Sequence, residues 1–215
     1  MTQTKESMDT GTTTMGIVGD GFVLLASDKR ASMGKYIASH DVQKVKPLTD
    51  NIAITFAGTV STIQFVKKVA QSRLRLKELN SGRKSTVKEA ASVLTNINFR
   101  NARGNPMPTA ASFIVGGFDD APRLFDVQPD GAMYELPEDT QYRAGGSGRM
   151  MAQSMLDDSW EPGMSEDDTV DLAVRALTSA VKRDSGSGSG MFVTVIDEDG
   201  FRVVKETDTL PTVKE

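Results

Sequence analysis

The order of its hydrophobic patterns constrains the fold of this chain more than any single motif does. Apolar runs at residues 12–18 and 22–27 flank Asp20-Gly21, which is a strong signal for a hairpin between two strands. From Val60 onward the apolar residues recur at helical spacing instead, and this pattern ends at Asn80-Ser81-Gly82. Strand-like and helix-like blocks then alternate again. Because hairpins join the strands, the sheets are expected to be largely antiparallel.

The remaining elements follow from the same kind of local signal. Capping boxes, in which Ser or Thr precedes an acidic residue by three positions, mark two helix starts. The further predicted helices open at Thr86 with Glu89, run from near Gly148 to Trp160, and open at Ser165 with Asp168 to run through Val181. The further predicted strands are Lys35 to Lys44, Asn51 to Phe56, Ala111 to Phe118, Arg123 to Val127, Ala132 to Leu136, Met191 to Asp197 and Phe201 to Lys205, with a turn at Pro47 to Asn51, a break at Gly104 to Pro108 and a polar tail through Glu215. This order predicts an α+β fold, a four-layer αββα sandwich of two largely antiparallel sheets between two helix layers.

Composition excludes several classes of chemistry. The chain has no cysteine, which excludes disulfides, thiolate metal sites and a cysteine nucleophile. Its single histidine, His40, lies in the polar stretch Ala38 to Asp41 and is more typical of a solvated loop histidine than of a base. A hydrolase built on this chain would therefore need a base other than histidine, and no metal or other cofactor is expected.

Length and charge narrow the class further. The 215 residues suit one domain with a substantial core, and the net charge of −4 comes from acidic and basic residues mixed along the chain. No polybasic block is present, which argues against binding to nucleic acid or to a membrane surface. Met1 to Asp9 lacks the apolar core of a secretory signal, and no apolar run approaches the roughly 18 residues of a membrane span. A cytoplasmic location is expected.

The junction Gly11-Thr12, at the start of the first apolar run, is the feature that most suggests an activity. Cutting this bond would expose Thr12 as a new N-terminus. A terminal threonine carries a nucleophilic hydroxyl, and its own α-amine, with a pKa of about 7.7–8.0, can take the proton near neutral pH. Taken alone, a Gly-Thr pair more often belongs to a frayed tail before a first strand. The interpretation of Thr12 as a nucleophile therefore depends on residues later in the chain.

Residues at several element ends could converge on Thr12, namely Asp28, Lys44, Gly58, Asp184 and Ser187. Each has an ordinary alternative: Asp28-Lys29-Arg30 would be a solvated strand end, and Lys44 an exposed alternating residue. Together they make chemical sense, because a buried lysine would lower the pKa of a nearby hydroxyl and a carboxylate would keep that lysine charged. A glycine N–H at a helix start is suited to hold an oxyanion.

An ordered set of motifs connects these residues to a known family. The motifs are Thr12-Thr13-Thr14-Met15-Gly16-Ile17, Ala26-Ser27-Asp28-Lys29-Arg30-Ala31, Lys44, Phe56-Ala57-Gly58, Gly145-Gly146-Ser147-Gly148 and Arg183-Asp184-Ser185-Gly186-Ser187-Gly188. In this order they resemble the catalytic β subunit of the core proteasome, most closely the archaeal type, which has the N-terminal nucleophile hydrolase fold. The resemblance runs from Gly11 to about Lys205. Any one motif is weak, whereas the ordered set is specific.

The resemblance implies a role for each motif. Residues 1–11 would be a propeptide removed by autocleavage between Gly11 and Thr12, and residues 12–215 a single peptidase domain. The implied catalytic residues are Thr12 as nucleophile, Asp28 as the acid that orients the lysine, Lys44 as that lysine, Gly58 as the oxyanion donor, and Ser147, Asp184 and Ser187 as the residues that hold the terminal amine and its water. The implied pocket for the substrate residue before the scissile bond includes Ala31, Val42, Phe56 and Val60. Lys46 falls where pocket residues occur, and either lines the pocket or points away.

The resemblance also implies an assembly. In this family β chains form heptameric rings, and two such rings stack between two rings of α subunits to enclose the active sites. The implied activity is threonine endopeptidase cleavage of unfolded proteins that an ATPase regulator feeds into the chamber. No nucleic acid and no membrane is among the implied partners.

Two alternatives from the sequence remain open. A simpler bacterial threonine peptidase forms two-ring particles without α subunits, and its chains also begin with Thr-Thr; the Asp28-Lys29-Arg30 segment and the longer C-terminal part argue against it. A non-catalytic structural β subunit has the fold without the chemistry. Such subunits lose the threonine or the lysine, whereas this chain has both Thr12 and Lys44.

Overall fold

Two antiparallel sheets face each other in the computed structural model, which describes residues 11–33, 36–104 and 111–209. Each of the two sheets has five strands, and a separate two-stranded sheet accompanies them. The predicted propeptide before Gly11, the strand start at Lys35, the break after Gly104 and the tail beyond Thr209 lie outside the described residues.

Thr12 lies immediately before β1, the second strand of the first sheet. The strand order of this sheet is β10-β1-β2-β11-β12, with bounds β1 (Thr13–Gly19), β2 (Phe22–Asp28), β10 (Tyr142–Gly146), β11 (Met191–Asp197) and β12 (Gly200–Thr207). β1 and β2 form the predicted hairpin, in which Gly19 pairs with Phe22. Gly21 has a φ of +78° at the turn, a conformation that glycine adopts without strain.

The second sheet has the order β5-β6-β7-β8-β9. Its strands are β5 (Val45–Thr49), β6 (Ile52–Gly58), β7 (Ala111–Phe118), β8 (Pro122–Val127) and β9 (Met133–Glu135). The small third sheet is the hairpin of β3 (Ala31–Met33) and β4 (Tyr36–Ser39). All pairings among the described strands are antiparallel, as the hairpin signals predict.

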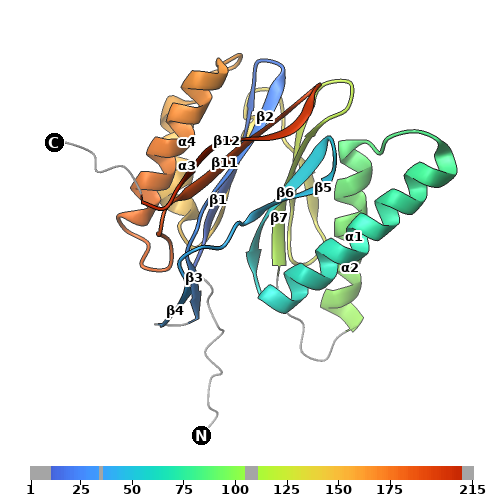
Figure 1. The fold of residues 1–215 in the computed structure, drawn as a ribbon, viewed down its shortest axis with the longest axis horizontal. Helices are drawn as coiled ribbons and strands as arrows, with labels where there is room; N and C mark the ends of the chain where they lie inside the picture. Colours follow the sequence, from blue (N-terminus) through green and yellow to red (C-terminus); the bar gives the residue numbers. More distant parts are fainter. Residues whose placement is uncertain (1–10, 34–35, 105–110, 210–215) are drawn as a thin grey trace, which may run out of the picture.

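Helix pairs cover the outer faces of the two large sheets. The helices are α1 (Val60–Ser81), α2 (Val87–Gly104), α3 (Arg149–Ser159) and α4 (Glu166–Val181). Figure 1 shows α3 and α4 on one outer side, α1 and α2 on the other, and the two sheets between them. The predicted four-layer αββα sandwich is therefore confirmed. No helix in the described ranges is both long and apolar enough to cross a membrane.

The alternation of side chains along β2 explains why both faces of the first sheet are buried. Phe22, Leu24 and Ala26 belong to the core shared with α3 and α4, whereas Val23 and Leu25 belong to the core between the sheets. Successive residues of a strand point to opposite faces, so one strand supplies both cores. A third core lies between the second sheet and α1 and α2. Because β1 and β2 are buried along their whole lengths, residues at their ends are held rigidly.

The predicted strand Lys35 to Lys44 and the predicted turn Pro47 to Asn51 are wrong in part. Only Tyr36–Ser39 is a strand within that first range, and residues 41–44 have no regular structure, because the Val42 N–H donates to the Lys29 carbonyl instead of to a neighbouring strand. Pro47 lies inside β5, since this strand is at the sheet edge, where proline's missing N–H is tolerated. The strands β3 and β10 were not predicted, and β10 exists because it pairs with β1.

Glu89, in the capping box that begins α2, stabilises the start of this helix. It accepts from the Thr86 N–H (2.9 Å), its own N–H donates to the Thr86 hydroxyl (3.2 Å), and its carboxylate pairs with Arg83 (2.6 Å) and Lys77. The predicted capping box is therefore confirmed. The hydrogen bond from Arg83 is the largest of the effects that hold the pKa of Glu89 well below its ordinary value.

Replacing Glu89 with glutamine is expected to lower the free energy of unfolding by about 1 kcal/mol at pH 7. Because folding depresses the pKa of this carboxyl, its contribution is present above the ordinary glutamate pKa of about 4.3 and fades as the pH falls below it. Urea unfolding at pH 7 and pH 3 measures the difference, with Glu138→Gln at an exposed position as control. A loss of equal size at both pH values would contradict the electrostatic explanation.

Candidate active site

Thr12 immediately precedes the first residue of β1, and only 5% of its surface is exposed. Its hydroxyl donates to the Gly11 carbonyl at 2.7 Å, across the peptide bond that joins the two residues. Its N–H donates to the Ser147 hydroxyl at 3.0 Å, and its carbonyl accepts from the Gly148 N–H at 3.2 Å. Hydrogen bonds thus hold both the N–H and the carbonyl of Thr12, and its hydroxyl lies against the Gly11–Thr12 peptide bond.

Gly11 packs directly on the backbone of the loop after α4. A Cβ atom on Gly11 would overlap the Cα of Gly186, and one on Gly186 would overlap the Cα of Gly11. Only glycine at both positions allows this approach of two backbones. The Ser-Gly tract at residues 185–190 is therefore a tight loop at the site, with Ser189 at a φ of +60°.

A buried ion pair lies beneath the Gly11–Thr12 bond. The Lys44 ammonium is 2.6 Å from Asp28 Oδ1 and donates to the Gly11 carbonyl at 3.5 Å. Asp28 ends β2 and Lys44 precedes β5, and their side chains are 0% and 4% exposed. Two backbone groups, the Thr13 N–H and the Gly188 N–H, each donate to the Asp28 carboxylate at 2.9 Å. The carboxylate is therefore fixed by β1 and by the loop after α4, and it fixes the lysine in turn.

Burial is the largest influence on both members of this pair. It lowers the pKa of the Lys44 ammonium below the ordinary lysine value, and the charge of Asp28 opposes that shift. Burial raises the pKa of Asp28, and Lys44, Thr13 and Gly188 oppose it through charge and hydrogen bonding. A lysine with a lowered pKa exchanges protons more readily at neutral pH than an exposed lysine does.

A second hydrogen-bonded group surrounds the Thr12 nitrogen. The hydroxyls of Ser147 and Ser187 both donate to Asp184 Oδ2 at 2.6 Å. Since the Ser187 proton is directed to the carboxylate, the Thr13 hydroxyl is the donor in its 2.8 Å bond to Ser187. Ser147 accepts from the Thr12 N–H, as described above, so a continuous chain runs from the Thr12 nitrogen through Ser147 to Asp184.

A cavity of about 290 Å³ opens on Thr12 from the side of the second sheet. Gly58 lies on it at the end of β6, with a φ of +128°, just before α1 begins. The predicted pocket residues Ala31, Val42, Phe56 and Val60 all line this cavity, together with Gly11, Thr12, Ser32, Ala38, Lys44, Gly58, Thr59, Ser61 and Ile63. The structure thus brings every predicted catalytic and pocket residue to one place, although their catalytic roles stay predictions.

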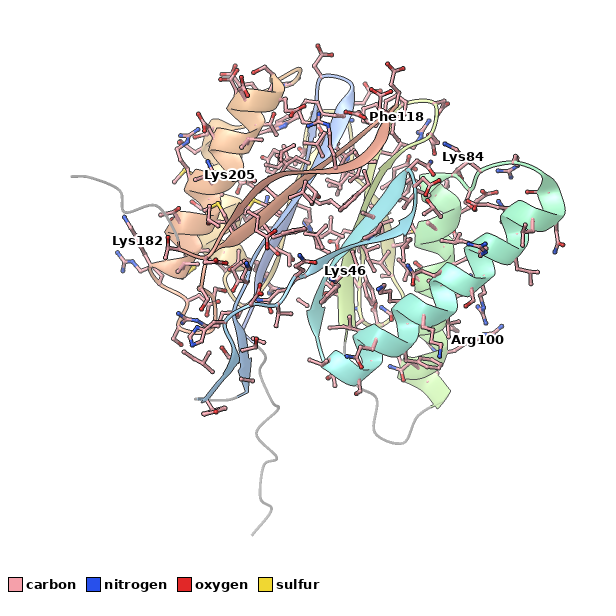
Figure 2. The ribbon with its side chains drawn as sticks, viewed as in Figure 1. Lys46, Lys84, Arg100, Phe118, Lys182 and Lys205 are labelled. Carbon is pink, nitrogen blue, oxygen red and sulfur yellow. The ribbon has the colours of Figure 1, made fainter. Side chains whose placement is uncertain are left out.

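Lys46 and His40 lie outside this constellation. Lys46, on β5 (labelled in Figure 2), is not among the described residues that line the cavity, and its ammonium donates to Gln43 at 2.9 Å. His40 is exposed, as expected of a loop histidine, and its Nδ1 lies 2.7 Å from the Ser189 hydroxyl.

The alternative view of Asp28-Lys29-Arg30 as a solvated strand end is wrong. Asp28 is fully buried and Lys29 is 2% exposed. Arg30 donates from its backbone to Asp28 (3.1 Å) and from its guanidinium to the Ser185 carbonyl (3.0 Å). Sequence reasoning missed Lys29, Arg30 and the Gly188 backbone as parts of the site, because a strand end gives no local signal of burial and a backbone donor gives none at all.

Comparisons with known proteins give similarity over nearly the whole chain. The family model described as "Proteasome subunit" matches residues 8–196. "Proteasome subunit beta" of Methanoregula boonei is 41% identical over 205 residues, covering 95% of this chain and 93% of the relative. The protein of the same name from Methanopyrus kandleri is 38% identical, covering 94% and 95%. That of Archaeoglobus fulgidus is 35% identical, covering 94% and 92%.

Proposed function

The chain belongs to the proteasome family as a β subunit, and from its site we propose that it is a threonine endopeptidase with Thr12 as nucleophile. The observation that carries the proposal is the buried Lys44–Asp28 pair beneath the Gly11–Thr12 bond. A burial of this kind costs free energy, and a purely structural subunit gains nothing from aiming the charge at the carbonyl that precedes Thr12. This observation favours the catalytic subunit over the structural one.

The first reaction that we assign to the site is removal of residues 1–11. The Thr12 Oγ attacks the Gly11 carbonyl carbon, the C–N bond breaks, and the acyl group passes to the oxygen as an ester while the nitrogen gains a proton. Water then hydrolyses the ester, which releases the Gly11 carboxylate and leaves a free Thr12 amine and hydroxyl. Lys44, already donating to the Gly11 carbonyl, is placed to stabilise negative charge on that oxygen.

The second reaction is cleavage of substrate peptides by the mature threonine. The freed amine occupies the position of the nitrogen that now donates to Ser147, and through a water at that serine it accepts the proton of Thr12 Oγ. The hydroxyl oxygen attacks the substrate carbonyl, the amine protonates the leaving nitrogen, and water hydrolyses the acyl-enzyme. Lys44 supplies positive charge beside the nucleophile, and Asp184 orients Ser147.

Gly58 and the cavity complete the site. We assign the Gly58 N–H, at the N-terminal end of α1, to the oxyanion of the substrate, where such donors contribute about 10²–10³ in rate. The cavity on which Ala31, Val42, Phe56 and Val60 lie is proposed to receive the substrate side chain before the scissile bond.

Assembly into stacked heptameric rings with α-subunit rings, supplied by an ATPase regulator in the cytoplasm, is part of the same proposal. The names of the relatives state that they are proteasome β subunits. Large apolar side chains on the outer face of α1 support an assembled state, since Phe65, Leu76 and Leu79 are 63%, 59% and 74% exposed.

The decisive test of the function is the intact mass and N-terminal sequence of the chain co-expressed with its candidate α subunit. The mature chain is expected to start at Thr12 and to cleave unfolded protein. Gly11→Ala is expected to slow leader removal about ten-fold or more, because the added Cβ overlaps Gly186 and moves the carbonyl away from the hydroxyl.

Gly104→Ala serves as the matched control, since a Cβ there meets nothing within 4 Å. Because cleavage removes residue 11, mature chains from Gly11→Ala and from wild type are identical and must have equal activity. An uncut wild-type chain in fully assembled particles would favour the structural subunit instead.

A further inference from the structure

Lys29 is a buried cation that the proposed reactions do not use. It follows Asp28 at the end of β2, and only 2% of its side chain is exposed. A lysine is almost never buried to this extent without partners, because removing an ammonium from water is costly. The groups that pair with Lys29 therefore affect the candidate site, because Lys29 directly follows Asp28.

Three carboxylates from two separate chain segments surround the Lys29 ammonium. Its Nζ lies 2.9 Å from Asp41, 3.0 Å from Glu206 and 2.8 Å from Asp208. Asp41 belongs to the irregular segment that leads to Lys44, whereas Glu206 and Asp208 lie at the C-terminal end of β12. The hydrogen bond that the Lys29 ammonium donates to Asp208 is the main cause that raises the pKa of Lys29 above its ordinary value, so the lysine is charged throughout the neutral range.

The backbone of Lys29 joins the same neighbourhood. Its carbonyl accepts from the Val42 N–H at 2.9 Å, and its N–H donates to the Gly188 carbonyl at 3.1 Å. Val42 lines the cavity beside Lys44, and Gly188 in turn donates to the Asp28 carboxylate. One residue thus contacts the segment that carries Lys44, the loop that carries Asp184 and Ser187, and the end of β12.

We propose that Lys29 is a positioning residue, which keeps Lys44 and the loop at residues 184–188 in register with Thr12 by clamping Asp41, Glu206 and Asp208 together. The C-terminal end of β12 then helps to position the catalytic residues, because its Glu206 and Asp208 pair with Lys29. This inference rests on the proposed threonine peptidase function.

The charge of the clamp predicts how its loss would behave. Asp41 and Asp208 are 76% and 91% exposed, so salt screens their mutual repulsion, whereas Lys29 itself is buried. Without the lysine, the three carboxylates repel one another. Among the described residues, only the Val42 N–H bond to the Lys29 carbonyl and the Lys44–Asp28 pair then still join residues 41–44 to the end of β2, so the segment can shift. A displacement of about 1 Å at a reacting group costs about 100-fold in rate, without a matching change in substrate affinity.

The experiment compares Lys29→Met, Lys29→Arg and the charge-matched control Lys84→Met in the assembled particle. Lys84 is exposed between α1 and α2 (labelled in Figure 2), and it is not among the described residues that line the cavity at Thr12 or that contact Lys29. For Lys29→Met we expect kcat to fall about ten- to a hundred-fold with KM nearly unchanged. Raising the salt from about 0.05 M to 1 M should restore about three-fold or more of that loss, because screening relieves the repulsion. Lys29→Arg should keep most of the activity, and Lys84→Met all of it.

The possible outcomes separate the two proposals. An active wild type with unchanged kcat in Lys29→Met would overturn the positioning role alone, as would a loss that neither salt nor arginine relieves. An inactive, uncut wild type would overturn the peptidase function. If Lys29→Met does not assemble, Asp41→Ala decides the matter: a fall in kcat of about three-fold or more with KM nearly unchanged supports the clamp, and an unchanged kcat refutes it.

Discussion

Replacing Thr12 with alanine is expected to leave the Gly11–Thr12 bond intact and to reduce peptide cleavage by about 10⁴- to 10⁶-fold. The substitution removes the hydroxyl that lies 2.7 Å from the Gly11 carbonyl, and with it both the attack on the leader and the attack on substrate. Intact mass measures the first effect, and hydrolysis of a fluorogenic peptide by the purified particle measures the second.

Folding of the Thr12→Ala chain is not expected to suffer. The backbone bonds of Thr12 to Ser147 and Gly148 remain, and β1 keeps its pairing with β2 and β10. Thr12→Ser is the matched control, because it keeps the hydroxyl and should still process itself and cleave peptides. Full peptidase activity in a purified Thr12→Ala particle would refute Thr12 as nucleophile.

Lys44→Met should cause the second large loss, about 10³-fold or more in peptide cleavage, together with about 3 kcal/mol in the free energy of unfolding. The activity falls because the cation beside the nucleophile is gone. The stability falls because Asp28 stays buried without its counter-charge, and burial then raises the pKa of Asp28 without the opposing effect of Lys44.

The double variant Lys44→Met with Asp28→Asn separates these two effects. It removes the unpaired buried charge, so unfolding measurements should show most of the lost stability restored, while cleavage should stay abolished. Restored cleavage in the double variant would contradict a chemical role for Lys44. Equal instability in the single and double variants would contradict the explanation through an unpaired charge.

The fold was predictable where local signals and the hydrophobic period agreed. Asp20-Gly21 predicts the first hairpin because the required turn geometry depends on those two residues alone. Thr86 with Glu89 predicts the start of α2, since the capping bonds join residues three positions apart. Prediction was wrong at residues 41–44 and failed to find β10, where the backbone partners are distant: Val42 bonds to Lys29, and Tyr142 pairs with Ile17.

The membership of the candidate site was also predictable, through the ordered motifs, but its energetics were not. Thr12, Asp28, Lys44 and Asp184 each have an ordinary surface interpretation when taken one at a time. Their spacing in the chain says nothing about the 2.6 Å contact between Lys44 and Asp28, or about the burial that shifts the pKa of both.

The sequence by itself determined the types of residue available for chemistry, the hairpins and caps, and the alternation that places one side of each strand in a core. These depend on atoms within a few residues of one another. Only the tertiary structure decided that Lys29 and Lys44 are buried and that the Thr12 nitrogen meets a serine 135 residues away. Burial and long-range contact arise from how the layers pack. The same lysine at a strand end is solvated in one packing, and in another it is buried and paired with carboxylates from distant segments.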